Sequence, residues 1–170
     1  MNISLAASGD EHGIALAHMR AWQAAYRGIV SDKFLDAMRV ADRITRWREI
    51  LQNPACKLLV AKQATETLGF VSFGRSRETN AKTTDGEIWT MYVCPSSWRG
   101  GVGKSLMNEA LAWLGQEGFK TVSVWVLKAN AQAIGFYSSC GFELQPYSAR
   151  YFDLGGQQLE EVALQRRNAA

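Results

Sequence analysis

Three glycines, Gly100, Gly101 and Gly103, lie in a short segment (residues 99–105) between an apolar, β-branched run at residues 88–93 and a pattern with helical spacing. Glycines let main-chain N–H groups approach an oxyanion closely, and the N-terminus of a helix favours negative charge. The segment therefore predicts a site for a phosphate-bearing ligand. An ordinary strand-to-helix turn, in which glycine only avoids strain, is the alternative interpretation.

The letters RGGVGKS in this segment are similar to the phosphate loop of some ATPases. The full pattern of that loop places a glycine five residues before Gly103, where this chain has Trp98. Such a loop also needs a following strand that ends in an acidic magnesium ligand, and residues 121–127 (TVSVWVL) contain no acidic residue. A P-loop nucleotidase is therefore a weak alternative.

An aromatic stripe is predicted on the first helix. Ile14, His18, Trp22 and Tyr26 recur every four residues, so they lie along one face of a helix. Ile14 is expected in the core. The three others are amphipathic, so they can pack in the core or wall a cavity.

Composition and charge exclude several classes of protein. A chain of 170 residues suffices for a single domain (residues 1–170), and a net charge of +3 without a basic run gives no reason to expect nucleic acid as a partner. Cys56, Cys94 and Cys140 are widely spaced, which favours reduced thiols over disulfides or a metal site. No apolar run is long enough to span a membrane, and no secretory signal is visible. We therefore expect a cytoplasmic protein with no metal and no membrane partner.

The pattern of apolar residues predicts alternating strands and helices. Strands are expected at 3–6, 58–62, 67–74, 87–93, 121–127, 142–144, 151–154 and 159–164, and helices at 11–26, 32–39, 42–51, 104–116 and 130–140. The polar residues 75–86 are expected to form an exposed loop. Asp10 is the expected N-cap of the first helix.

Two signatures in order carry a resemblance to a known family. A strand, a Gly-x-Gly turn, a long helix and a second strand are followed by NAQAIGFYSSCGF at residues 130–142. This arrangement resembles the GCN5-related N-acetyltransferase (GNAT) family, whose members use acetyl-coenzyme A. Gly101 and Gly103 match the family's first signature, Gln/Arg-x-x-Gly-x-Gly/Ala, whereas Trp98 stands where Gln or Arg is expected. The second signature is matched by Asn130, Ala133, Phe136, Tyr137, Gly141 and Phe142.

The resemblance extends to both ends of the chain and implies a fold. Trp22, Tyr26 and Gly28 look like the first helix of a branch that acetylates small molecules, and LGGQQLEEVAL at residues 154–164 looks like its final hairpin. The implied fold is mixed α/β, with a mostly antiparallel central sheet flanked by helices. In this fold two central strands, here 87–93 and 121–127, splay apart, and the pantetheine arm of the cofactor pairs with the freed backbone. The cofactor-binding residues that the resemblance implies are Met91, Tyr92, Val93, Arg99, Gly100, Gly101, Val102, Gly103, Lys104, Ser105, Asn130 and Tyr137.

The resemblance also implies catalytic roles. A family tyrosine at the position of Tyr137 protonates the leaving thiolate, a task that suits a phenol because it keeps its proton at neutral pH. A buried tyrosine with a satisfied hydroxyl is the alternative, and Asn130 can equally be a simple N-cap. For the general base, the position of Glu87 at the start of the central strand, on the same strand face as Trp89 and Met91, makes it the candidate, acting directly or through water. A solvated carboxylate is the alternative for Glu87, and His18 or water is the alternative base.

The sequence thus predicts an N-acetyltransferase that transfers acetyl from acetyl-coenzyme A to a small-molecule amine by direct attack in a ternary complex. The residues expected to bind the acceptor are His18, Trp22, Tyr26, Trp89 and Trp125. A protein or peptide amine is a possible acceptor, a non-catalytic module that senses acyl-coenzyme A is the main alternative, and a homodimer is a possible assembly.

Overall fold

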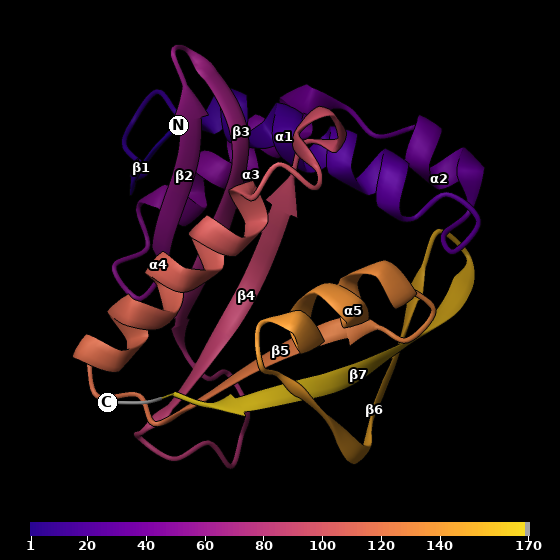
Figure 1. Cartoon of the computed structure of the whole chain (residues 1–170). Coiled ribbons are helices and arrows are strands. Elements are labelled where there is room, and N and C mark those ends of the chain that lie inside the picture. Colours follow the sequence, from indigo (N-terminus) through magenta and orange to yellow (C-terminus); the bar gives the residue numbers. More distant parts are fainter. Residues whose placement is uncertain (169–170) are drawn as a thin grey trace.

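The computed structural model describes residues 1–168, which form one seven-stranded sheet with helices on both faces (Figure 1). The strands are β1 (Asn2–Leu5), β2 (Lys57–Gln63), β3 (Glu66–Arg75), β4 (Asp85–Val93), β5 (Thr121–Leu127), β6 (Glu143–Leu154) and β7 (Gln157–Arg167). The helices are α1 (Glu11–Ala25), α2 (Asp32–Asp36), α3 (Val40–Leu51), α4 (Val102–Gln116) and α5 (Ala131–Ser139), with a 3-10 turn at Pro95–Ser97. The strand order is β1-β2-β3-β4-β5-β7-β6, and β4 with β5 is the one parallel pair among these strands. The predicted mixed α/β fold with a mostly antiparallel sheet is confirmed.

Both faces of the sheet are covered by helices that pack on it through apolar clusters. On one face, α1 and α3 pack against β2 and β3 through side chains that include Ile14, Trp47 and Phe70. On the other face, α4 packs through residues spaced at helical intervals, among them Leu106 and Leu114, and the same cluster continues under α5 (Figure 1). Because helices cover both faces, ligands can reach the middle of the sheet only where the strands themselves separate.

Such a separation exists between β4 and β5. The two strands pair over only four positions, from Asp85 opposite Thr121 to Ile88 opposite Val124. Beyond this point they diverge, as Figure 1 shows by the different directions of the two arrows. The expected parting of the two central strands is therefore observed, and it leaves main-chain N–H and C=O groups of 89–93 without a partner strand on that side.

A β-bulge lies at the point where β4 leaves β5. Ser72 of β3 lies opposite Thr90, whereas the next residue, Phe73, lies opposite Ile88, so Trp89 is an extra residue in β4. The bulge breaks the alternation of side chains. Met91 consequently packs on the same cluster as Ile88, under α4. The prediction that Met91 shares a face with Glu87 is wrong for this reason.

Several element boundaries differ from the predicted ones. Residues 142–144 and 151–154 belong to one strand, β6, whose pairing with β7 is interrupted between Leu144 and Ala149. Helix α4 begins at Val102, two residues earlier than expected. The Asp10 side chain does not cap α1; it accepts a hydrogen bond from Ala7 N and forms an ion pair with Lys62. No helix within residues 1–168 has the length and apolar character needed to cross a membrane.

Candidate active site

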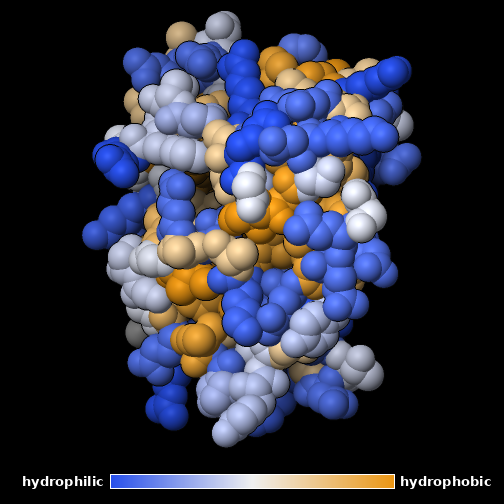
Figure 2. Space-filling view, turned by 90° about the vertical axis from the view of Figure 1, so that its right-hand side faces the viewer, coloured by the Kyte–Doolittle hydropathy of each residue, from blue (hydrophilic) through white to orange (hydrophobic). Residues whose placement is uncertain are grey.

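A cavity of about 500 Å³ opens where β4 and β5 part. Its walls come from the C-terminal end of α1, from β4, β5 and β7, from the turn before α4, and from α5. Figure 2 shows the face on the right-hand side of Figure 1, where apolar side chains gather in the middle and hydrophilic ones surround them. We call the part of the cavity at residues 97–104 the glycine end, and the part at Trp89, Trp125 and Glu161 the tryptophan end.

The glycine end presents the N-terminus of α4 to the cavity. Gly101 is the N-cap residue, and its φ of +82° is a left-handed conformation that glycine adopts without strain. Because the first helical hydrogen bond is donated by Ser105 N to Gly101 O, the N–H groups of residues 102–104 have no helical acceptor. Arg99 and Lys104 are among the residues that line the same part of the cavity. This arrangement suits an anion.

Gly103 allows a close approach between two helices. A Cβ atom at this position would lie 3.2 Å from Cε2 of Phe136 in α5 and 3.5 Å from Cε of Met91 in β4. A larger side chain would therefore displace the neighbours or fill the cavity. The glycine is needed here for space, whereas Gly101 is needed for its backbone conformation.

Trp98 connects the glycine end to β4. Its indole Nε1 donates a hydrogen bond of 2.8 Å to the carbonyl oxygen of Val93, the last residue of the strand. Trp98 stands where the family signature has Gln or Arg. In this chain the side chain anchors the turn to the strand, which a sequence pattern alone does not indicate.

Helix α5 brings Asn130 and Tyr137 to the cavity wall. Asn130 Oδ1 accepts a hydrogen bond of 3.0 Å from Ala133 N, so the side chain acts as the N-cap of α5. Tyr137 lies two turns later, is buried against Phe136 and Phe142, and lines the cavity. Burial raises the pKa of the Tyr137 phenol above its usual value, so the hydroxyl keeps its proton throughout the neutral range.

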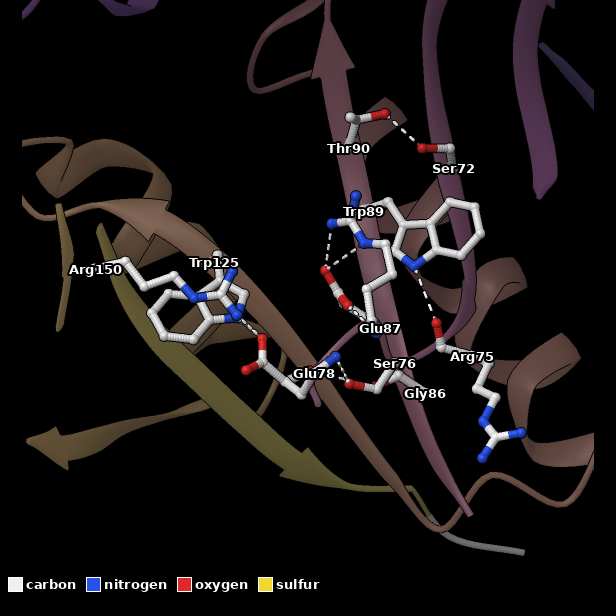
Figure 3. A network of polar contacts seen from close by, with 12 residues as sticks. Ser72, Arg75, Ser76, Glu78, Gly86, Glu87, Trp89, Thr90, Trp125 and Arg150 are labelled. Carbon is white, nitrogen blue, oxygen red and sulfur yellow. Dashed lines mark hydrogen bonds and ion pairs between the residues drawn. The ribbon is translucent and has the colours of Figure 1, made fainter. Parts of the chain in front are cut away.

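At the tryptophan end, a loop bridges the parted strands. Glu78, in the loop between β3 and β4, accepts a hydrogen bond of 3.1 Å from Trp125 Nε1 of β5 and forms an ion pair with Arg150 of β6 (Figure 3). The Arg150 guanidinium lies 3.6 Å from the centre of the Trp125 ring. The loop thus ties β5 and β6 to the side of the sheet that carries β3 and β4.

The same loop engages the predicted base. Glu87, labelled in Figure 3, is only 1% exposed. Both of its carboxylate oxygens accept hydrogen bonds from Arg77, one from the main-chain N at 2.8 Å and the other from the guanidinium. The Arg77 guanidinium also lies 5.2 Å from the centre of the Trp89 ring. Glu87 is not among the residues that line the cavity. A direct general base needs a free oxygen that faces the amine, and Glu87 offers none in this arrangement.

Glu161 is an ionisable residue of the cavity wall that the sequence analysis did not select. It lies on β7, directly opposite Leu127 of β5, and lines the cavity together with Trp125. Burial raises the pKa of the Glu161 carboxyl, although the positive charges of Arg150 and Arg77 act in the opposite direction. The sequence holds no distinctive signal for it, because Glu161 is one of two consecutive glutamates in a largely polar strand. Which of the two side chains faces the cavity is defined only by the strand pairing.

The aromatic stripe of α1 divides between the core and the cavity. His18 is 8% exposed, stacks on Tyr92 with ring centres 4.8 Å apart, and accepts a hydrogen bond of 3.1 Å at Nδ1 from Trp47 Nε1. Burial, helped by the charges of nearby arginines, lowers the pKa of His18 to about 3, so the ring is neutral at physiological pH. Trp22 packs between His18 and Tyr26. Of the stripe residues Ile14, His18, Trp22 and Tyr26, the cavity lining includes Tyr26 alone.

Comparisons with known proteins identify the family of this chain. Residues 17–142 match the acetyltransferase (GNAT) family. The chain belongs to the GNAT family. An uncharacterized N-acetyltransferase of Bacillus subtilis, YuaI, is 26% identical over 155 residues, which cover 91% of this chain and 86% of the relative.

Solved structures of GNAT proteins share the fold over nearly the whole chain. The PaiA N-acetyltransferase from Thermoplasma acidophilum, in complex with coenzyme A, superimposes with a TM-score of 0.76 at 16% identity and covers 98% of this chain and 99% of that chain. The structure of YncA from Salmonella typhimurium with its cofactor acetyl-CoA gives a TM-score of 0.75 at 22% identity and covers 100% of this chain and 95% of that chain.

As a GNAT protein, the chain is an acetyl-coenzyme A-dependent N-acetyltransferase, and the P-loop nucleotidase is set aside. The structure brings most of the predicted site residues to one cavity. The implied cofactor-binding residues that line it are Met91, Tyr92, Val93, Arg99, Gly101, Gly103, Lys104, Asn130 and Tyr137. Gly100, Val102 and Ser105 do not line it, and the Val102 side chain is buried in the core. Of the predicted acceptor residues, Tyr26, Trp89 and Trp125 line the cavity, whereas His18 and Trp22 do not.

Proposed function

We propose that this GNAT enzyme transfers the acetyl group of acetyl-coenzyme A to the amine of a small molecule, by direct attack while both substrates are bound. The observation that carries the proposal is a single cavity with two chemically different ends. A helix N-terminus with free N–H groups lies at one end, and an aromatic pocket with one carboxylate lies at the other. The parted strands β4 and β5 connect the two.

The chain's own residues fit the cofactor. The free N–H groups at the start of α4, with Arg99 and Lys104 beside them, suit the pyrophosphate group. The unpaired main-chain groups of Met91 and Tyr92 suit the amides of the pantetheine arm, because buried peptide groups need hydrogen-bonding partners. These two features lead the thioester toward Tyr137 on α5.

Tyr137 is proposed to act on the leaving sulfur. The hydroxyl keeps its proton because burial raises the pKa of the phenol, and it is therefore available as a donor to the developing thiolate. A donor aimed at the atom that gains charge stabilises the transition state more than the bound thioester. Tyr137 would thus affect turnover rather than cofactor affinity.

Direct attack is favoured over an acyl-enzyme because the cysteines are poorly suited as nucleophiles. Burial raises the pKa of all three thiols, to about 11 for Cys56 and above the usual range for Cys94 and Cys140. A nucleophilic cysteine needs a lowered pKa that maintains the thiolate. Within residues 1–168, no cysteine lines the cavity.

The test is an acceptor screen of the purified full chain that follows release of free coenzyme A thiol. The panel contains alkyl and arylalkyl primary amines, amino acids and short peptides with free N-termini. Turnover with a small primary amine, dependent on acetyl-coenzyme A, is the expected result. Turnover with peptides alone would identify a protein acceptor, and tight cofactor binding without turnover across the panel would instead favour the sensing module.

A further inference from the structure

The charged groups of the tryptophan end leave one carboxylate without a partner. Arg77 pairs with Glu87, and Arg150 pairs with Glu78. For Glu161, no hydrogen bond or ion pair of the side chain is found within residues 1–168. Two guanidinium groups and three carboxylates give this end a net charge of −1. The uncompensated negative charge lies on the one member of the set that lines the cavity.

Glu161 and Tyr137 approach the cavity from opposite faces of the sheet. Residues directly opposite each other on paired strands share a face, so Glu161 lies on the face of Leu127. Leu127 packs with Leu35 of α2, whereas Tyr137 belongs to the cluster that includes Val124, under α5. A thioester held between the parted strands would therefore have Tyr137 on one side and Glu161 on the other.

We propose that Glu161 binds the ammonium group of the acceptor and takes its proton, and that the acceptor is a primary amine without a carboxylate next to the nitrogen. This inference rests on the proposed function and gives it a base and a substrate class. Glu161 replaces Glu87 and His18 as the residue that contacts the reacting nitrogen.

The substrate class follows from the pairing of the arginines. An amino acid would bring a carboxylate with its ammonium group, and that carboxylate needs a cationic or hydrogen-bonding partner when it loses water. The two guanidinium groups of this end are already bonded to Glu87 and Glu78 (Figure 3). The net charge of −1 at the tryptophan end is neutralised by one ammonium group, which favours an acceptor that carries a single positive charge and no carboxylate. The aromatic walls, formed by Tyr26, Trp89 and Trp125, suit a cation that carries an apolar or planar body.

The reaction balances with these two residues. The ammonium group loses one proton to the Glu161 carboxylate, and the free amine forms a bond to the acetyl carbon. The bond from that carbon to sulfur breaks, and Tyr137 donates its proton to the sulfur. The nitrogen loses a second proton as it becomes an amide, which restores the Tyr137 phenol, and Glu161 releases the first proton to water. The products are the amide, free coenzyme A and one proton.

The surroundings of Glu161 support proton acceptance. Burial raises the pKa of the carboxyl, which narrows the gap to the more basic ammonium group. The ionisable and charged groups that face Glu161 from the neighbouring elements are Tyr26 at the end of α1, Arg77 in the β3–β4 loop, Glu87 and Tyr92 on β4, and Arg150 on β6. Arg150 lies directly opposite on β6, and its charge counteracts the effect of burial.

The experiment compares Glu161→Gln with a matched control, Glu160→Gln. Glu160 is the neighbouring residue of β7. Its side chain forms an ion pair with Lys128, and Glu160 does not line the cavity. With 2-phenylethylamine as acceptor, Glu161→Gln is expected to lower kcat/KM by about 100-fold, within the usual range for loss of a general base. The dissociation constant of coenzyme A should stay unchanged, and Glu160→Gln should stay within about twofold of the wild type.

Two further readouts separate a chemical role from a structural one. In the wild type, kcat/KM should rise with pH as Glu161 loses its proton. In Glu161→Gln the rise of kcat/KM that follows deprotonation of Glu161 should disappear. The remaining rise of kcat/KM should continue up to the pKa of the acceptor's ammonium group. Glu161→Asp, which keeps the carboxylate, should recover part of the activity.

For the substrate class, wild-type kcat/KM for 2-phenylethylamine should exceed that for free phenylalanine by at least about tenfold, since the latter adds an uncompensated carboxylate.

The outcomes distinguish this inference from the proposed function. Wild-type turnover that Glu161→Gln leaves unchanged would overturn the role of Glu161 while the transferase stands. Preference for phenylalanine over 2-phenylethylamine would overturn the substrate class. Coenzyme A binding with no turnover on any amine would overturn the proposed function itself, and the inference with it.

Discussion

The two ends of the cavity are built from different parts of the chain. The glycine end consists of main-chain amides and the start of one helix, all within residues 97–104. The tryptophan end is lined by Tyr26 and by residues of β4, β5 and β7, with Trp125 and Glu161 at its centre. Glu78 of the β3–β4 loop and Arg150 of β6 contact Trp125 from outside the lining. The glycine end is formed by residues that are close together in the sequence and depends on backbone geometry. The tryptophan end is formed by side chains that the fold brings together from distant segments.

This difference reflects what each end must recognise. Main-chain N–H groups are present whatever the side chain, so a helix N-terminus can bind a phosphate with only a requirement for space and φ angles. Recognition of one amine among many needs specific charges and shapes, which only side chains supply. Substitutions at the two ends should therefore change different measurable constants. Four variants test this, in order of expected effect.

Tyr137→Phe should have the largest effect, because Tyr137 lies between the two ends. Loss of the hydroxyl is expected to lower kcat by about 100-fold. The coenzyme A dissociation constant and the acceptor KM should change little, since the ring still packs between Phe136 and Phe142. Tyr151→Phe, at an exposed position of β6, is the control. Unchanged turnover would show that the hydroxyl takes no part in the chemistry.

Gly103→Val should act on the glycine end alone. The Cβ atom would meet the Phe136 ring at 3.2 Å, and the branched side chain would project into the cavity. We expect coenzyme A affinity to fall by about 50-fold, from overpacking and the loss of close approach to the amides. Isothermal titration of coenzyme A measures this. Gly135→Val, in α5 where a Cβ meets no atom within 4 Å, should leave the affinity near wild type.

Glu78→Gln should act on the tryptophan end alone. The amide can still accept the hydrogen bond from Trp125, but the charge that pairs with Arg150 is lost. We expect KM for 2-phenylethylamine to rise by up to about fivefold, the scale of an exposed ion pair, and tolerance of free phenylalanine to improve. Coenzyme A affinity should not move. A change in coenzyme A affinity as large as the change in KM would contradict the division into two ends.

The smallest effect on binding is expected from Gly101→Ala, compared with Gly118→Ala. The two glycines have similar angles, φ +82° and +84°, and a Cβ at either meets nothing within 4 Å. Each variant should lose about 1–2 kcal/mol of unfolding free energy from the left-handed conformation. Only Gly101→Ala should weaken coenzyme A binding, by about threefold, because it perturbs the amides at the start of α4. If the two variants bind coenzyme A equally well, the left-handed conformation of Gly101 does not contribute to coenzyme A binding.

The local features of the fold could be predicted from the sequence, whereas those that depend on contacts between distant segments could not. The strand, turn and helix around the glycines were predicted because each depends on neighbouring residues, and the parting of β4 and β5 came from the family resemblance. The bulge at Trp89 was missed, since nothing in the local pattern of β4 shows that the strand pairs out of register with β3. The pairing of Glu87 with Arg77 and the position of Glu161 were missed for a related reason. Both depend on contacts between residues distant in the sequence, which only the folded sheet defines.

The bulge at Trp89 also bears on how the enzyme meets its substrates. It bends β4 while the strand stays paired with β3 on both sides of the bulge, so the divergence from β5 is set by the sheet itself. The cleft is thus preorganised, and its opening requires no disruption of secondary structure and no ordering of a segment when ligands arrive. We therefore expect the backbone of β4 and β5 to have the same protection from hydrogen exchange, outside the cofactor-contacting groups, in the free and the coenzyme A-bound enzyme.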